Sequence, residues 1–212
     1  MSATHLQLIN ETSERFGPNV VVFFPPNSDN GAEPIYAWKV IQRLGVYLRH
    51  PIRIDQGFTL QLVDPWGNYL PPRTLRQGTR YRIVRQEADL SVQEEALLGL
   101  GGIQVLNDLK EGSIGIKIQN DEKTAFGRPS LGPGQLASFQ LSSTIQFAWS
   151  VADLKPGSVL NPLTLHSFSQ VISLSSLSSA NVLMQGGGPG PGAQRIRYPL
   201  TQIKLRNPAT TE

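Results

Sequence analysis

The chain of 212 residues contains no cysteine. This absence excludes disulfide bonds, thiolate metal ligands and cysteine nucleophiles, while a protein of this length can bury a stable core without covalent links. No apolar run approaches the roughly 20 residues that cross a bilayer, and the first residues lack the basic and apolar regions of a secretory signal. We therefore expect no membrane span, and a protein that is cytoplasmic or exported without a cleavable signal.

Charge is scarce in the C-terminal part of the chain. Residues 129–194 hold only two charged side chains, Asp153 and Lys155. In contrast, residues 39–85 hold nine basic residues against two acidic ones, and residues 87–123 hold eight acidic residues against three basic ones. Because repulsion does not keep a charge-poor stretch away from other surfaces, this stretch forms either core or a contact surface.

Short apolar runs with period-two alternation recur along the chain and are separated by glycine, proline, asparagine and aspartate. This pattern is typical of strands in an all-β protein. The predicted strands are 19–24, 58–64, 80–85, 113–120, 137–151, 169–177 and 194–205.

One helix is predicted near the middle of the chain. Ser91 followed by Glu94 matches a capping box, good helix formers follow it, and Gly101 ends the run. The sequence therefore predicts a short helix over residues 91–100.

Two similar pentapeptides suggest an internal duplication. YAWKV occupies residues 36–40 and FAWSV occupies residues 147–151. Placing each residue beside the one 110 positions later also pairs Asn10 with Asn120. Repetition over about 100 residues indicates two related β units, although tryptophan often follows a small residue in β proteins and the match can be accidental. The predicted division is a β unit over 1–88, helix and linker over 89–112, and a second β unit over 113–207.

The three tryptophans have different surroundings. Trp38 and Trp149 are flanked by apolar residues at alternate positions, so we predict that both are core side chains rather than ligand-stacking platforms. Trp66 lies in DPWGNY, a predicted turn, and we expect its ring and that of Tyr69 to be exposed.

The sequence contains no recognisable motif for catalysis or metal binding. The three histidines are far apart and lack acidic neighbours at ligand spacing, and no nucleophile-elbow motif is present. We therefore predict no catalytic residue, no metal and no cofactor, and we expect that the protein is not an enzyme, unless a site forms only in three dimensions. The glycine-rich segment 185–194 lacks the lysine and the following helix of a phosphate loop, which favours a hairpin loop or an arm that inserts into a neighbouring subunit.

An arginine-rich segment covers residues 73–85. On a strand, Arg80 and Arg82 share one face, opposite Tyr81 and Ile83. The net charge of the whole chain is only +3, so nucleic acid is not the expected partner. The arginines form either a solvated strand face or an ion-pair surface between subunits, with acidic segments of opposite charge nearby in the sequence.

The stretch LINETSERFGPNVVVFFPPN, residues 8–27, followed by YAWKV, resembles a poorly characterised group of small bacterial β-sandwich proteins. The resemblance implies a jelly-roll-like sandwich. Some similar sequences carry ring-opening dioxygenase names, but the clustered histidine and glutamate ligands of a non-heme iron site are absent here.

We therefore predict a structural protein that assembles with copies of itself into a homo-oligomer, filament, tube, shell or inclusion. The alternative is a monomeric binding module for carbohydrate, another small molecule or another surface, with Trp66 and Tyr69 as its platform. The residues predicted for self-association are Trp66, Tyr69, Arg80, Arg82, Gly186, Gly187, Gly188, Pro189, Gly190, Pro191 and Gly192.

Overall fold

The computed structural model describes residues 3–13, 19–26, 34–87, 89–97, 101–141, 143–188 and 192–206. These residues form an all-β sandwich protein, which confirms the predicted fold class. Besides strands they contain one 3-10 turn, Pro162–Thr164, where the side chain of Asn161 accepts a hydrogen bond from the backbone N–H of Leu163. The described residues include no helix that is long and apolar enough to cross a membrane.

The chain divides into two compact units. Unit 1 consists of Met1–Pro25, Ile35–Gln56 and Ser143–Glu212, and unit 2 consists of Pro26–Pro34 and Gly57–Ser142. Unit 1 is therefore built from both ends of the chain, with most of unit 2 between them in sequence. The compact units do not follow the predicted division into 1–88, 89–112 and 113–207.

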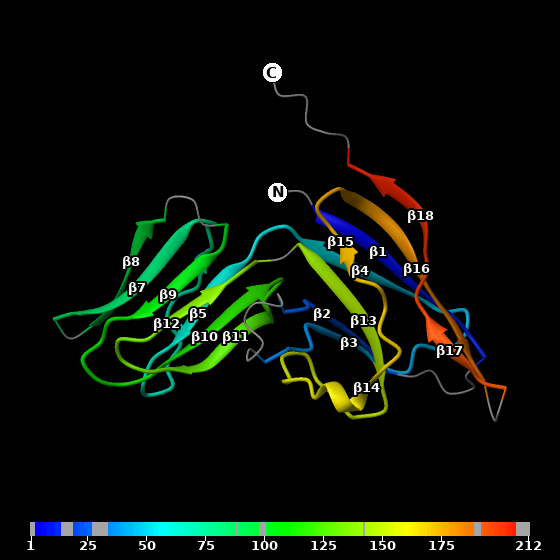
Figure 1. Ribbon diagram of the computed structural model, residues 1–212, viewed down its shortest axis with the longest axis horizontal. Coiled ribbons are helices and arrows are strands. Elements are labelled where there is room, and N and C mark those ends of the chain that lie inside the picture. Colours follow the sequence, from blue (N-terminus) through cyan, green and yellow to red (C-terminus); the bar gives the residue numbers. More distant parts are fainter. Residues whose placement is uncertain are drawn as a thin grey trace, which may run out of the picture. The chain divides into compact units, whose positions relative to one another are not determined.

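Unit 1 contains two sheets (Figure 1). One has the order β17-β16-β1-β4, with β18 also paired to β16, and the other has the order β14-β13-β2-β3, with β15 also paired to β13. The pair β1·β16 is parallel, whereas the other pairs are antiparallel. The strands are β1 (Ala3–Thr12), β2 (Asn19–Phe23), β3 (Lys39–Ile41), β4 (Arg49–Asp55), β13 (Thr144–Ser150), β14 (Leu165–His166), β15 (Ile172–Ser173), β16 (Leu177–Gly187), β17 (Gln194–Arg197) and β18 (Leu200–Leu205).

Unit 2 also contains two sheets, with the orders β11-β10-β5-β6 and β12-β9-β7-β8. Its one parallel pair among the described strands is β7·β9. The strands are β5 (Thr59–Val63), β6 (Arg73–Thr74), β7 (Thr79–Gln86), β8 (Asp89–Ala96), β9 (Ile103–Asn107), β10 (Ile114–Asn120), β11 (Lys123–Leu131) and β12 (Leu136–Phe139).

The two units share one strand arrangement. In unit 1, β1 pairs in parallel with β16 and antiparallel with β4; in unit 2, β9 pairs in parallel with β7 and antiparallel with β12. The remaining sheets agree as well, because β13-β2-β3 corresponds to β5-β10-β11. Strands β1 to β4 therefore correspond to β9 to β12, and the strands from β13 onward correspond to β5 to β8.

Two buried asparagines support this correspondence. Asn10 in β1 donates from its side-chain Nδ2 to the Leu44 carbonyl at 2.6 Å, and Asn107 in β9 donates to the Leu131 carbonyl at 2.8 Å. Each side-chain oxygen accepts the backbone N–H of the residue two positions later, at 2.9 Å and 3.2 Å. Both asparagines are fully buried. The same polar contact thus organises the loop before β4 and the loop before β12.

The backbone of these two loops matches too. Tyr47 and Gly134 both have positive φ, 61° and 69°, and their N–H groups donate to the carbonyls of Asn10 and Asn107. The sequence agrees in the same order along the chain, which indicates that strands β1 to β8 and β9 to β18 arose by duplication, and we refer to them as the two sequence copies. Matching segments are LQLIN (6–10) and IQVLN (103–107), LGVYL (44–48) and LGPGQ (131–135), TLQL (59–62) and TIQF (144–147), and LPPRTL (70–75) and LNPLTL (160–165).

The alignment at 110 residues is wrong. Asn10 corresponds to Asn107 rather than to Asn120, because Asn120 ends β10 and donates instead to the Gly57 carbonyl. The two pentapeptides occupy unrelated places, since Trp38 precedes β3 and Trp149 lies in β13. Each unit takes half of its strands from each sequence copy. We call residues 3–25 and 35–56 the front half of unit 1 and residues 143–206 its back half.

The predicted helix over residues 91–100 is wrong for residues 91–96, and its residues 98–100 lie outside the described residues. Residues 89–96 form β8, which pairs with β7 in unbroken register from Gln86↔Asp89 to Thr79↔Ala96. Leu90 and Val92 alternate with polar residues, so the segment also has the period of a strand. Pairing with β7 satisfies its backbone, whereas a helix of this length is marginal on its own.

We predict that Asn10→Ala and Asn107→Ala each lower the free energy of unfolding by about 1–3 kcal/mol, because buried backbone groups lose their hydrogen-bond partners. The matched control is Asn181→Ala, which removes an exposed hydrogen bond to Gln202 and is expected to change stability by less than about 0.5 kcal/mol. Urea denaturation followed by circular dichroism measures the difference. A control-sized effect at either buried asparagine would contradict the shared structural role.

Candidate functional site

The front and back halves of unit 1 meet along a seam that runs through both sheets. In the first sheet, β1 pairs with β16 over eight residue pairs, from His5↔Ser179 to Thr12↔Gly186. In the second sheet, β2 pairs with β13 over five residue pairs, from Asn19↔Ser150 to Phe23↔Gln146. The seam lies between the two central strands of each sheet, β1 and β16 in the first and β2 and β13 in the second. Neither half is therefore a complete sandwich by itself.

Side chains reinforce the seam at both ends of the β1·β16 pair. Thr4, which is fully buried, donates to the Leu177 carbonyl at 2.9 Å and accepts from the Arg206 guanidinium at 2.7 Å. At the other end, Gln185 donates to the Glu11 carboxylate at 2.8 Å. These contacts join residues that lie almost a whole chain length apart.

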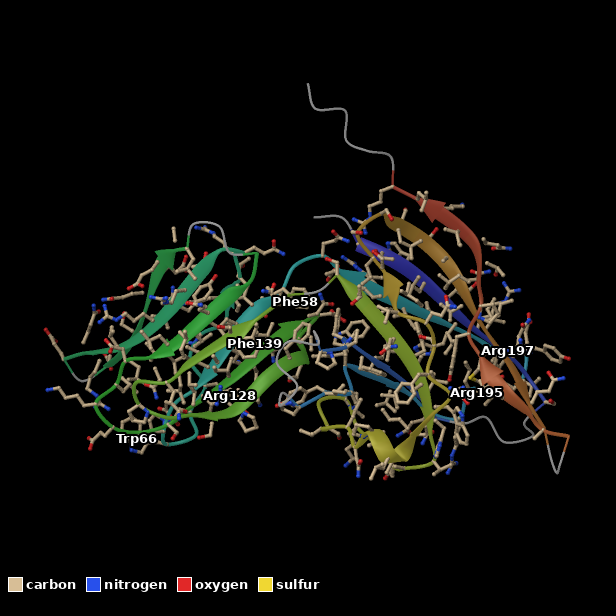
Figure 2. The ribbon with its side chains drawn as sticks, in the orientation of Figure 1. Phe58, Trp66, Arg128, Phe139, Arg195 and Arg197 are labelled. Atoms are coloured by element: carbon tan, nitrogen blue, oxygen red, sulfur yellow. The ribbon has the colours of Figure 1, made fainter. Side chains whose placement is uncertain are left out.

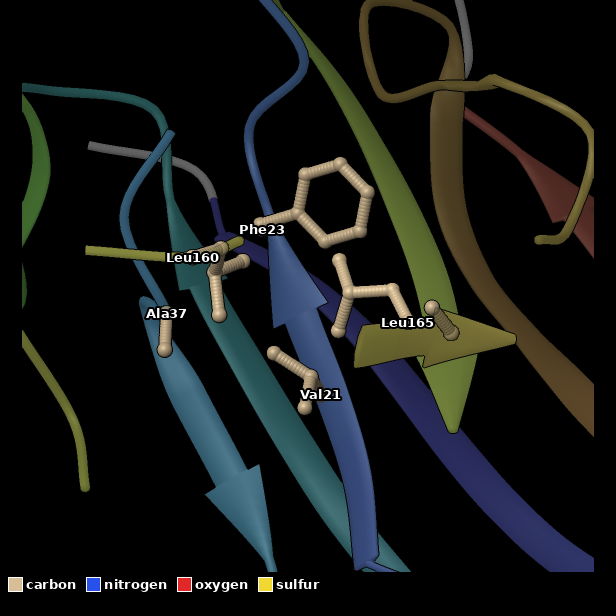
Figure 3. Packing of buried hydrophobic residues seen from close by; sticks show 6 residues of the cluster. Val21, Phe23, Ala37, Leu160 and Leu165 are labelled. Atoms are coloured by element: carbon tan, nitrogen blue, oxygen red, sulfur yellow. The ribbon is translucent and has the colours of Figure 1, made fainter. Parts of the chain in front are cut away.

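Apolar side chains from the two halves pack together against the second sheet (Figure 3). Val21 and Phe23 from β2 and Ala37 before β3 pack against Leu160 and Leu165 of the back half. All five are at least nine-tenths buried. Because fully burying a large apolar side chain contributes roughly 1.5–3 kcal/mol, this cluster is a substantial part of what holds the halves together.

The turn after β5 carries the two exposed aromatic side chains that the sequence indicated, Trp66 and Tyr69. Figure 2 shows the position of Trp66. Trp66 is 67% exposed and Tyr69 is 58% exposed. The Arg85 guanidinium lies 5.5 Å from the centre of the Trp66 ring, and the Lys117 Nζ lies 4.8 Å from the centre of the Tyr69 ring. A cation therefore already occupies the vicinity of each ring.

Arg80 and Arg82 form their ion pairs within unit 2. Arg80 Nη1 lies 3.5 Å from the Glu95 carboxylate, and its Nε and Nη2 donate to the Gln104 side chain. Arg82 Nε donates to the Asp108 carboxylate at 2.9 Å. The acidic residues near these arginines in the sequence are thus their partners in the same chain.

The glycine-rich segment begins within β16 of unit 1. Gly186, Gly187 and Gly188 all have positive φ, and a Cβ on Gly186 would lie 2.6 Å from the Arg195 carbonyl oxygen. The Gly186 carbonyl accepts the backbone N–H of Ser13 at the end of the seam. Gly192 directly precedes the short segment that leads into β17. Pro189, Gly190 and Pro191 lie outside the described residues.

The two tryptophans predicted for the core differ in burial. Trp38 is 1% exposed and packs edge-on against Phe24, with ring centres 5.5 Å apart. Trp149 is only half-buried, and its ring centre lies 4.9 Å from that of His166. Within the part of the chain that the structure describes, its indole Nε1 has no hydrogen-bond partner. Trp149 therefore contributes less to the core than Trp38.

Among the described residues, no group of three or more histidine, aspartate or glutamate side chains is placed to hold a metal ion. The chain matches no protein-family model, no curated protein and no solved structure.

The sequence analysis did not predict the seam, although two similar segments indicated it. LQLIN at 6–10 and IQVLN at 103–107 mark equivalent strands, and a search for repeats led by these segments would have aligned the two copies correctly. The tryptophan pentapeptides were more conspicuous but occupy strands that are not equivalent. No local sequence pattern indicates that each unit combines strands from both sequence copies.

We predict that Arg82→Ala lowers the free energy of unfolding by less than about 1 kcal/mol, because its ion pairs are partly exposed to water. The effect should shrink in high salt, which screens the pairs. Lys110→Ala is the matched control, since Lys110 has no ion pair among the described residues. The oligomeric state should stay the same in both variants; selective loss of association in Arg82→Ala would restore a role for this arginine between copies.

Proposed function

We propose that this chain is a structural protein that associates with copies of itself through the back half of unit 1. The observation that carries the proposal is the position of its exposed apolar side chains. Of the twelve large apolar side chains that are exposed among the described residues, seven belong to the back half. These are Val151, Val159, Leu163, Phe168, Val171, Ile203 and Leu205.

Part of this apolar surface lies on an edge strand. Among the described strands, β18 pairs only with β16, and its register with β16 shifts twice. Ile203 is 53% exposed and Leu205 is 64% exposed, while Lys204 is the one charged residue of the strand. Exposed edge strands usually carry more charge, because charge discourages the pairing of one sheet with another. A second copy can therefore add a strand at this edge.

A groove in the back half is lined in part by Leu200 of β18. It has a volume of about 610 Å³ and is lined by residues 168–172, by Gln185 and by residues 197–200. Phe168 and Val171 expose their side chains there, at 41% and 54%. Burial of these side chains by another copy would remove apolar surface from water, which is the main driving force of association.

We predict that Ile203→Lys weakens self-association, because a lysine on an edge strand opposes the addition of another strand. Leu48→Lys is the matched control, since Leu48 is 58% exposed but lies in the front half. Light scattering over a range of concentrations gives the mass of each variant relative to the 23.2 kDa chain. Equal association of Ile203→Lys and wild type would contradict the role of this edge, and a wild-type monomer at every concentration would contradict self-association.

A second candidate function is a binding module, and the exposed aromatic pair on the turn after β5 favours it. Aromatic rings accessible to solvent can stack against sugar rings or other flat ligands, and Arg85 and Lys117 supply hydrogen-bond donors beside Trp66 and Tyr69. This reading requires no second copy.

For this second function we predict that Trp66→Ala abolishes ligand binding and leaves the fold intact. The probe is a set of soluble oligosaccharides of cellulose, chitin and xylan, with binding measured by calorimetry. Tyr47→Ala serves as the control, because Tyr47 is 79% exposed and belongs to unit 1. Absence of heat with every oligosaccharide, or equal binding by wild type and Trp66→Ala, would remove this candidate.

A further inference from the structure

We propose that copies of this chain associate by exchanging halves of unit 1, so that the front half of one copy completes a sandwich with the back half of another. This inference rests on the proposed self-association and adds a second contact to the strand addition at β18, namely the seam within unit 1. The partner is a second copy of the chain, and the contact surface is the seam already present within one copy.

The halves of unit 1 hold together without a direct chain connection. The front half ends at Gln56 and the back half begins at Ser143, so the whole of residues 57–142 lies between them in sequence. What joins the halves is the pairing of β1 with β16 and of β2 with β13, together with the buried cluster around Phe23. A back half from another copy offers the same strands and the same side chains.

The duplicated sequence supplies the second argument. Strands β1 to β4 come from the first sequence copy, yet they form a sandwich with strands from the second copy. In unit 2 the reverse holds, since β5 to β8 from the first copy pair with β9 to β12 from the second. Both units therefore combine halves from different copies of the repeat, which is the same relation that domain swapping creates between separate chains.

Both crossings between the units are short. β4 ends at Asp55 and β5 begins at Thr59, and β12 ends at Phe139 and β13 begins at Thr144. Each of these connections joins one half of unit 1 to unit 2, so exchange of a half with another copy redirects the chain at these few residues. In each repeat the short connection lies at the equivalent place, between the fourth and fifth strands.

The exchanged and closed forms of unit 1 contain the same pairs and the same buried cluster. Their free energies therefore differ by the entropy lost on association and by changes at the two short connections. Concentration then decides between the forms. Reciprocal exchange between two copies gives a closed dimer, whereas exchange with a different neighbour at each half gives an open chain of copies.

Two single-cysteine variants test the exchange directly, because the chain has no cysteine of its own. His5 and Ser179 are register partners on the parallel pair β1·β16, and neither side chain is buried. Adjacent strands place such partners within the Cα distance that a disulfide requires. We mix His5→Cys chains with Ser179→Cys chains at high concentration, refold them together from urea, and oxidise them.

The expected result is a disulfide between the two different chains in the associated fraction on a non-reducing gel. A mixture of His5→Cys with Lys155→Cys controls for random collision, because Lys155 is exposed in the same unit but has no register with β1. We expect several-fold more cross-linked dimer from the Ser179→Cys mixture. Circular dichroism establishes that each variant has refolded.

A chain with both His5→Cys and Ser179→Cys provides the decisive comparison. Oxidised as a dilute monomer, it locks the seam within one copy, and we expect it to associate less than its reduced form at the same concentration. If the locked chain associates as well as the reduced one, or if the mixed disulfide does not exceed the control, exchange is wrong while self-association stands. If neither wild type nor the reduced chain associates at any concentration, the proposed function is wrong too.

Discussion

The parallel pairing of β1 with β16 is the interaction on which the rest of unit 1 depends. It joins residues 5–12 to residues 179–186, so it brings the start of the chain to a strand near its end. Every other element of unit 1 is attached to one of these two strands, or to the second sheet that packs with them. Without this pair, the front half would end in unpaired strand edges, and so would the back half. Unpaired edges are what bind other chains.

This dependence explains why the ends of the seam carry buried hydrogen bonds. Thr4 has no access to water, so its hydroxyl needs partners inside the protein, and it finds them in Leu177 and Arg206. A displaced back half would leave this hydroxyl without them, at a cost in free energy. In the proposed exchange, the back half of another copy would supply the same two partners to Thr4.

Sequence reasoning reached the fold class but not the connectivity. Period-two alternation predicted strands correctly at 80–85 and 113–120, because alternation follows directly from one buried and one less buried face. The predicted strand at 19–24 is instead a continuous apolar run that is buried on both faces. The predicted strand 137–151 merged β12 with β13, which belong to different units, because apolar alternation continues through the crossing. The predicted helix failed because pairing with β7 outweighed the helix propensity of residues 91–96.

The candidate site was even less visible in the sequence. Exposure of Trp66 and Tyr69 followed from a turn containing proline and glycine, which is local information. The partners of Arg80 and Arg82 did not follow, because Gln104 and Asp108 belong to a neighbouring strand and to the residue just after it. The seam depends on which copy of the repeat supplies each half. The two halves lie far apart in the chain, and no local pattern of polar and apolar residues encodes their pairing.

Interstrand nuclear Overhauser effects of Leu8 in β1 are the most direct test of this architecture. In the structure described here, Leu8 faces Val182 of the second sequence copy, and its equivalent Val105 faces Tyr81 of the first. Contacts between Leu8 and Val182 are therefore predicted. Contacts between Leu8 and Tyr81 would show that each sequence copy folds on itself, and would contradict the account of exchanged halves.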